Sequence, residues 1–200
     1  MELDRQARAI EAMQLKAPDA YGQSGFQGDA ARWEALRRPC VAAVDRSGAF
    51  LDIGCANGLF LESAVAWAGQ MGYKLEPYGL DHSEALAKLA RDRLGVGRDR
   101  IFVGDCATWE PPRRFDHVRT ELVYVQGEIR RAYVERLVDN FLAPGGRVIV
   151  ASYGTRGGVP PAEDVGAHMA GWGFTVEGQG EGVDTWSDKT LTRVAWVACR

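Results

Sequence analysis

The sequence predicts a doubly wound α/β fold, in which a mostly parallel sheet of seven strands ends in an antiparallel C-terminal hairpin. Three observations carry this prediction. From residue 49 onward, short apolar runs of strand character alternate with helix-like segments, which is typical of a parallel sheet covered by helices on both faces. A glycine-rich turn follows the first of these runs, and two β-type runs joined by a polar segment close the chain.

Residues 1–48 precede the predicted sheet and form a helical extension. The first 16 residues are rich in helix formers, and Pro18 ends that helix. A loop rich in Gly, Ser and Asp follows, and then a short helix that stops at Pro39. Because 200 residues suit one domain, we expect residues 49–200 to form the core and residues 1–48 to be an addition, a candidate lid.

The core alternates regularly as far as its fifth strand. The expected strands are residues 49–53, 75–81, 100–105, 115–118 and 145–153. The expected helices between and after them are residues 59–71, 83–94, 130–142 and 162–169. Residues 173–178 and 192–199 are the two β-type runs of the closing hairpin.

Composition excludes several classes of protein. A hydrophobic fraction of 46% and a charged fraction of 26% are ordinary for a globular protein, and no apolar run approaches the length of a membrane span. The N-terminus MELDRQARAIEAMQLK lacks the apolar centre of a secretory signal. We therefore expect a cytoplasmic protein without membrane contact.

The net charge and the spacing of the cysteines limit the classes of ligand and partner that we expect. A net charge of −3 gives no basic footprint for nucleic acid, so a small-molecule partner is favoured, and nothing indicates an oligomeric state. The four cysteines, Cys40, Cys55, Cys106 and Cys199, are scattered without metal-ligand spacing. We expect neither a metal site nor structural disulfides.

The segment FLDIGCANGLF places a strand, then Gly54 and Gly58, then the start of a helix in immediate succession. A nucleoside cofactor can approach such a turn closely only where no Cβ intrudes. The following helix offers free backbone amides to an anionic group. A fingerprint for NAD would need G-x-G-x-x-G, whereas Ala56 holds the middle position here and Leu59 follows Gly58.

The same residues carry a family resemblance. LDIGCANG resembles the first signature of class I, Rossmann-like, S-adenosylmethionine-dependent methyltransferases, which is an acidic residue followed by GxGxG. The resemblance implies that Asp52 holds the ammonium end of the cofactor and that Gly54, Ala56 and Gly58 form the turn beneath it. Ala56 departs from the usual glycine, but it replaces one small residue by another.

Two further segments extend the resemblance. In YGLDHSEALAKLA, Asp81 ends the second strand, where a carboxylate can accept hydrogen bonds from both ribose hydroxyls, and His82 is expected beside the adenine. RIFVGDCATWE is similar to the adenine-reading turn of the family. There the resemblance implies that Asp105 accepts a hydrogen bond from the exocyclic amine of the adenine and that the backbone amide of Cys106 caps the adenine ring.

Substrate contacts are expected at the carboxyl ends of the strands, where open parallel sheets bind their ligands. In-line transfer of a methyl group needs a positioned nucleophile, and a general base is optional. Our candidates for catalysis are Glu121 as base and Tyr124 as its orienting partner. The candidates for substrate binding are Thr120, Tyr153, Trp186 and, from the N-terminal loop, Tyr21 and Phe26.

The sequence therefore predicts a methyltransferase that uses S-adenosylmethionine and acts on a small molecule. Residues 119–125, RTELVYV, lack the (N/D)PP(Y/F) pattern of relatives that methylate exocyclic amines of bases or glutamine side chains. Two alternatives stay open: a non-catalytic module that binds S-adenosylmethionine or a nucleotide, and an NAD-dependent oxidoreductase.

Overall fold

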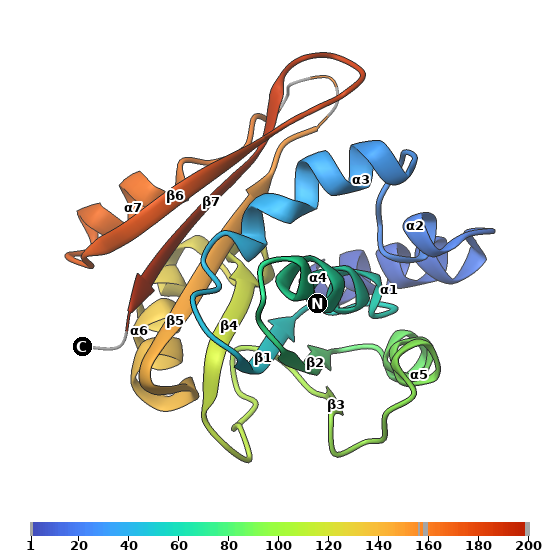
Figure 1. The fold of residues 1–200 in the computed structure, drawn as a ribbon. Helices are drawn as coiled ribbons and strands as arrows, with labels where there is room; N and C mark the ends of the chain where they lie inside the picture. Colours follow the sequence, from blue (N-terminus) through green and yellow to red (C-terminus); the bar gives the residue numbers. More distant parts are fainter. Residues whose placement is uncertain (1, 156, 158–159, 199–200) are drawn as a thin grey trace.

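The computed structural model of the chain describes residues 2–155, 157 and 160–198, and of residues 2–8 only the backbone. Its centre is one seven-stranded sheet with the order β3-β2-β1-β4-β5-β7-β6 (Figure 1). All neighbours pair in parallel except β7, which is antiparallel to both β5 and β6. The predicted fold, including its C-terminal hairpin, is confirmed. The strands are β1 (Gly48–Ile53), β2 (Leu75–Asp81), β3 (Ile101–Val103), β4 (Phe115–Glu121), β5 (Leu142–Tyr153), β6 (Val176–Val183) and β7 (Thr190–Ala198).

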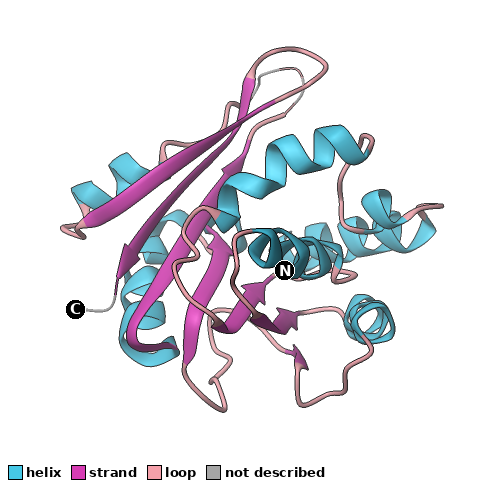
Figure 2. Cartoon of the chain, in the orientation of Figure 1, coloured by secondary structure: helices cyan, strands magenta, loops and turns pink. Residues whose placement is uncertain are grey.

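Helices cover both faces of the sheet (Figure 2). On one face, α3, α4 and α5 pack over a buried cluster that includes Phe50, Leu61 and Ala87. On the other, α6 and α7 cover a second cluster built around Leu51 and Val150. The helices are α1 (Glu2–Lys16), α2 (Ala20–Gln23), α3 (Ala30–Arg37), α4 (Leu59–Gln70), α5 (Glu84–Leu94), α6 (Arg130–Arg136) and α7 (Val165–Gly171). Short 3-10 or π turns lie at Arg38–Val41, Leu122–Tyr124, Gly127–Ile129 and Leu137–Phe141.

The N-terminal extension has two parts. Its second part, α3 and the 3-10 turn after it, belongs to the core: Trp33 and Leu36 are buried, and the backbone carbonyl of Leu36 accepts a hydrogen bond from the Thr192 hydroxyl of β7 at 2.8 Å. Its first part, α1 and α2, packs outside the sheet, where α1 contacts α2 and α5. Only residues before α3 are therefore placed to cover the core as a separate layer.

The fourth strand is longer than the sequence suggested. It continues through Arg119, Thr120 and Glu121, which we had placed in the connection after it. The polar side chains of these residues do not end the strand, because β1 and β5 flank it and continue the backbone ladder: Arg119 pairs with Asp52 on one side and with Ile149 on the other. The sixth strand likewise runs to Val183, through residues expected to be a polar loop.

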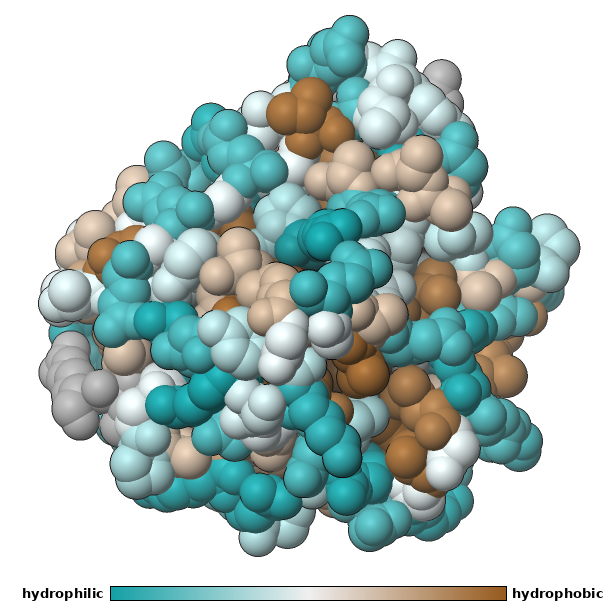
Figure 3. Space-filling model, in the orientation of Figure 1, coloured by the Kyte–Doolittle hydropathy of each residue, from teal (hydrophilic) through white to brown (hydrophobic). Residues whose placement is uncertain are grey.

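The outer surface carries both hydrophilic and apolar residues. On the face shown in Figure 3, hydrophilic residues surround apolar patches of limited size. Among the described residues, no helix combines the length and the apolar character that crossing a bilayer requires. Within the same residues, no three His, Cys, Asp or Glu side chains gather closely enough to hold a metal ion. Cys199 lies outside the described residues.

Candidate active site

The turn between β1 and α4 has a left-handed backbone at three positions: Gly54 with φ +79°, Ala56 with φ +46° and Gly58 with φ +76°. At Gly54 a Cβ would lie 2.3 Å from the Tyr124 hydroxyl, so only glycine fits beneath that ring. At Gly58 a Cβ would press on Ala90 of α5 at 3.1 Å. The turn thus lets the Tyr124 ring pack directly on Gly54, and it lets α4 and α5 approach each other at Gly58.

Asp81, at the end of β2, is tied to this turn. Its Oδ2 accepts a hydrogen bond from the backbone N–H of Ala56 at 2.8 Å, and its Oδ1 accepts from that of Ser83 at 2.9 Å. Burial raises its pKa although both amides favour the charged form. Because a carboxylate offers about four acceptor positions, two of them are not used by these amides. His82 is exposed, with Nδ1 3.5 Å from Oδ1 of Asp81.

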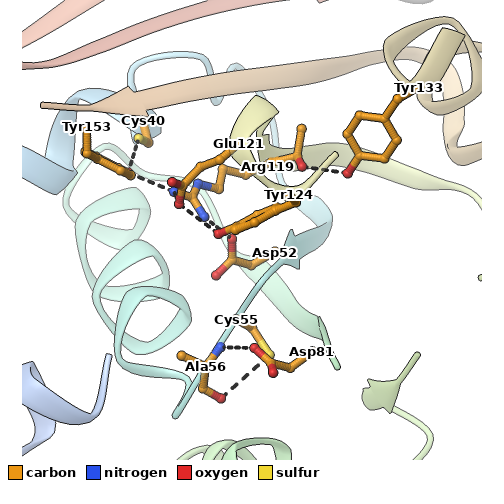
Figure 4. A network of polar contacts seen from close by, with 11 residues as sticks. Cys40, Asp52, Cys55, Ala56, Asp81, Arg119, Glu121, Tyr124, Tyr133 and Tyr153 are labelled. Atoms are coloured by element: carbon orange, nitrogen blue, oxygen red, sulfur yellow. Dashed lines mark hydrogen bonds and ion pairs between the residues drawn. The ribbon is translucent and has the colours of Figure 1, made fainter. Parts of the chain in front are cut away.

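A buried ion-pair network lies beside the turn (Figure 4). Nη1 of Arg119 donates to Oδ1 of Asp52 at 3.1 Å, and both side chains are at most 5% exposed. Burial opposes the charge on Arg119, but its tyrosine and carboxylate neighbours outweigh burial and raise its pKa, so it stays a cation. Burial raises the pKa of Asp52 to about 6, although Arg119 pulls it the other way. Oδ2 of Asp52 is buried, and none of the described residues is hydrogen-bonded to it.

Glu121 and two tyrosines complete the network. Oε1 of Glu121 accepts from Nη2 of Arg119 at 2.6 Å and from the Tyr124 hydroxyl at 2.8 Å. The hydroxyl of Tyr153 accepts from Nη2 of Arg119 at 2.9 Å and lies 3.3 Å from Sγ of Cys40. Asp52, Glu121, Tyr124 and Tyr153, which the sequence analysis chose from three different strand ends, thus meet around one arginine.

The N-terminal residues lie over the same turn. The side-chain amide of Asn57, inside the turn, donates to the backbone carbonyl of Ala20 in α2 at 2.8 Å. Tyr21, Phe26 and Trp33 form an aromatic cluster, with ring centroids 5.1–6.1 Å apart. The N-terminal segment is therefore attached directly to the glycine-rich turn.

A clasp, which we define as Arg32 and Asp184, joins α3, directly after this segment, to the loop between β6 and β7. Nε of Arg32 is hydrogen-bonded to Oδ1 of Asp184, and both side chains are buried. The guanidinium stands over Phe26 at 5.1 Å and over Trp186 at 4.8 Å from the ring centroids. The structure thus brings Phe26 and Trp186 together through Arg32.

Comparisons with known proteins agree with this architecture. No protein-family model and no curated protein matches the sequence. Among solved structures, a protein from Pyrococcus horikoshii OT3 has a TM-score of 0.65 at 17% identity, over 98% of this chain and 99% of that one. The glycopeptide N-methyltransferase MtfA has a TM-score of 0.64 at 16% identity, over 88% and 92%. The N-methyltransferase NodS from Bradyrhizobium japonicum WM9, solved with S-adenosylhomocysteine, has a TM-score of 0.58 at 17% identity, over 99% and 96%.

This chain has the fold of class I S-adenosylmethionine-dependent methyltransferases. In this methyltransferase fold, the network and the glycine-rich turn both stand at the carboxyl ends of the central strands β1 and β4, where sheets of this kind bind ligands. The residues fit the cofactor. Oδ2 of Asp52, which is buried and has no hydrogen-bond partner among the described residues, suits an ammonium group.

Three predicted site residues lie apart from the network. Thr120 points to the opposite face of the sheet, where its hydroxyl is hydrogen-bonded to that of Tyr133 at 2.7 Å. Asp105 is exposed, and its Oδ1 accepts from the backbone N–H of Ala107 within its own loop. Cys106 is nearer, with Sγ 4.0 Å from the backbone carbonyl of Tyr124, and burial raises the pKa of its thiol to about 11.

Two residues of the site were not selected from the sequence, Asn57 inside the turn and Arg32. Arg119 was placed among the residues after the fourth strand, but not as the shared cation. Arg119 left little signal, because in FDHVRTE it stands between Val118 and Thr120 in a run that is already largely polar. Asn57 and Arg32 left none, since their partners come from distant parts of the chain.

Proposed function

We propose that this protein transfers the methyl group of S-adenosylmethionine to a small-molecule acceptor. The observation that carries the proposal is a left-handed glycine turn beside the buried Oδ2 of Asp52, which has no hydrogen-bond partner among the described residues, on the fold of methyltransferases. The net charge of −3 supports an acceptor other than nucleic acid. Two structural neighbours carry the name N-methyltransferase, one of them acting on a glycopeptide.

The roles of the binding residues follow from their positions. Asp52 would accept from the ammonium group, and the turn Gly54–Gly58 with the start of α4 would receive the carboxylate end. Asp81 would accept from the ribose hydroxyls with its remaining lone pairs. Asp105 and Cys106 follow β3 and His82 follows β2, so these residues would lie on the adenine side of a bound cofactor. When bound, the cofactor supplies an activated methyl group, so the protein's task is positioning.

The proposed catalytic group is the carboxylate of Glu121, which Arg119 and Tyr124 hold in position. Arg119 and Tyr124 both donate to Oε1 of Glu121, which leaves Oε2 outside these two contacts. Glu121 would use Oε2 to take the proton of an acceptor that must lose one, and Tyr124 would keep the carboxylate oriented. Tyr153, on the other side of Arg119, would line the acceptor side of the pocket.

The N-terminal segment would close that pocket. Its α2 is bonded to Asn57, and its aromatic cluster reaches Trp186 through Arg32. A cover of this kind excludes water and strengthens the charge interactions beneath it. Tyr21, Phe26 and Trp186 would then contact the acceptor, while Thr120 would act only indirectly, from the far face.

Binding and turnover together test the function. We expect S-adenosylhomocysteine, but not NAD, to raise the melting temperature, because a ligand that binds only the folded state stabilises it. Incubation with S-adenosylmethionine and a panel of small amines, alcohols and thiols should release S-adenosylhomocysteine. Stabilisation by NAD alone would identify an oxidoreductase, and binding without turnover on any acceptor would identify a non-catalytic module.

Asp52 should make cofactor affinity depend on pH. Burial raises the pKa of Asp52 to about 6. Below that pH the carboxyl is protonated, and it must lose this proton before it can pair with an ammonium group. Bound ammonium lowers that pKa, so affinity is full above pH 6 and falls below it, by at most about tenfold per pH unit. Calorimetric titration of S-adenosylhomocysteine between pH 5 and 7 measures this slope, and Asp52→Asn should flatten it. An equal slope in the variant would assign the proton to another group.

A further inference from the structure

Arg37, the last residue of α3, has hydrogen-bond donors that the described residues do not use. Its side chain is partly buried, and no described residue accepts a hydrogen bond from its guanidinium or forms an ion pair with it. Arg32 and Arg119, by contrast, each pair with a buried carboxylate. A guanidinium offers five N–H donors in a planar fork. Those of Arg37 are therefore available to an anion.

Three aromatic rings hold the guanidinium of Arg37 in place. Its Cζ lies 3.6 Å from the ring centroid of Tyr153, 5.1 Å from that of Phe26 and 5.2 Å from that of Trp33. Contacts of this kind attract the cation to the ring and leave its N–H groups unused. The fork is thus oriented before any ligand binds, which lowers the cost of binding one.

Arg37 lies next to the proposed acceptor side of the site. Tyr153, which the guanidinium overlies, ends β5, and its hydroxyl accepts from Nη2 of Arg119 at 2.9 Å (Figure 4). The same Nη2 donates to Oε1 of Glu121, the proposed base, at 2.6 Å. Two side chains, Tyr153 and Arg119, thus connect Arg37 to Glu121. An anchor at this separation suits one end of a small acceptor whose reacting group lies at the other.

In the proposed complex, Arg37 has no counter-charge. The ammonium group of the cofactor pairs with Asp52 there, so Arg119 is left to balance Glu121. Arg37 is partly buried, so solvent screens its charge less than that of an exposed arginine. An unpaired cation therefore lies beside the side of the site that the acceptor approaches.

The neighbours of Arg37 supply no anion of their own. Burial raises the pKa of the Tyr153 hydroxyl and of the Cys40 thiol above their ordinary values, so both groups are neutral at neutral pH. Glu34, one turn earlier in α3, is hydrogen-bonded to Arg38. An anionic group of the acceptor would provide the missing counter-charge.

We propose that Arg37 binds a carboxylate group of the methyl acceptor. The inference rests on the proposed function and adds the substrate class: a small amine, alcohol or thiol that also carries a carboxylate. Two parallel N–H donors of a guanidinium match the two oxygens of a carboxylate, and such charge-assisted bonds are stronger than neutral ones. Arg37 holds that group beside Tyr153, while the reacting group of the acceptor lies toward Glu121.

The experiment compares acceptor analogues in matched pairs, each a carboxylate and the amide of the same shape. The pairs are para-aminobenzoate and para-aminobenzamide, para-hydroxybenzoate and para-hydroxybenzamide, and mercaptopropionate and mercaptopropionamide. Calorimetry measures their affinity for the wild-type protein with and without S-adenosylhomocysteine. We expect at least one carboxylate to bind at least about tenfold more tightly than its amide, because the amide loses the charge-assisted bonds.

Three variants test whether Arg37 causes this preference. Arg37→Met keeps the length of the side chain but removes its charge and donors, and it should reduce the preference to about twofold or less. Arg37→Lys keeps the charge without the planar fork and should retain part of the preference. Arg38→Met, the control, removes the neighbouring exposed arginine and should retain all of it.

Melting curves establish that each variant is folded. A loss confined to the carboxylates, with S-adenosylhomocysteine bound as before, separates a binding role of Arg37 from a general loss of structure. If Arg37→Met does not fold, the comparison of Arg37→Lys with the wild-type protein still decides, since an undiminished preference in Arg37→Lys would show that the fork of Arg37 is not used.

The outcomes separate this inference from the proposed function. The inference is wrong if no carboxylate of the panel binds more tightly than its amide, or if the preference persists in folded Arg37→Met. Tighter binding of para-aminophenyl phosphate than of para-aminobenzoate would assign the site to phosphate and overturn the carboxylate. If carboxylates are preferred through Arg37 but S-adenosylhomocysteine does not bind, the anion site stands and the proposed function fails.

Discussion

Replacing Gly54 by alanine is expected to abolish the binding of S-adenosylhomocysteine. The backbone at Gly54 has φ +79°, which costs an L-residue about 1–2 kcal/mol. The new Cβ would also lie 2.3 Å from the hydroxyl and 2.4 Å from Cζ of Tyr124. That ring would be displaced from its bond to Glu121, so the substitution would disturb the turn and the network together. Calorimetry should show a loss of at least about a hundredfold, roughly 2.7 kcal/mol.

The matched control is Gly69→Ala, the same substitution in α4. Among the described atoms, nothing lies within 4 Å of a Cβ added there, and its backbone is helical. Alanine should stabilise the helix by up to about 1 kcal/mol and leave affinity unchanged. Both variants are compared by thermal melting before titration. Normal affinity in a folded Gly54→Ala protein would show that this turn is not the cofactor site.

The fold was predictable from the sequence because its signals are local. Apolar runs of strand length, the caps of the helices and the turn glycines each lie within a few residues of one another. Ser83, for example, begins the helix expected at residues 83–94, and its hydroxyl accepts from the backbone N–H of Leu86 at 3.1 Å, as an N-cap does. The position of Asp81 at the end of β2 followed from the same local pattern.

The network could be predicted only in part. The position of Glu121 and Tyr124 after an apolar run predicts their place in the site, but the polarity of Arg119, Thr120 and Glu121 predicts a connection, whereas these three residues belong to β4. Polarity normally marks a connection. Here Arg119 is buried because Asp52 and Tyr153 approach it from β1 and β5, and only the register of three strands shows this.

The clasp could not be predicted at all, since Arg32 and Asp184 are 152 residues apart. Arg32→Met is expected to destabilise the protein by about 3–5 kcal/mol, because it leaves a buried carboxylate without its cation. Burial opposes the charged form of Asp184, but the hydroxyl of Ser187 and the guanidinium of Arg32 outweigh burial and lower its pKa. The stabilisation is therefore present above the unfolded pKa near 3.8 and is lost as pH falls through the lower, folded pKa.

Urea unfolding at neutral and at acid pH measures this effect. The difference between wild type and Arg32→Met should shrink in acid, and Asp184→Asn added to Arg32→Met should recover part of the loss. Arg38→Met is the matched control: Arg38 pairs with Glu34, but both side chains are about half exposed, at 44% and 48%. Removing that exposed pair should cost no more than about 1 kcal/mol.

Arg32→Met also tests whether the N-terminal segment is a lid. Without the clasp, Phe26 and Trp186 lose the guanidinium that stands over both rings. If the segment closes the acceptor pocket, turnover at a temperature where the variant is folded should fall by more than tenfold while cofactor affinity changes by less, because Asn57 still holds α2 on the turn. If stability falls and turnover stays normal, the segment contributes packing alone. If Arg32→Met is as stable as Arg38→Met, the ion pair with Asp184 is not what holds the segment in place.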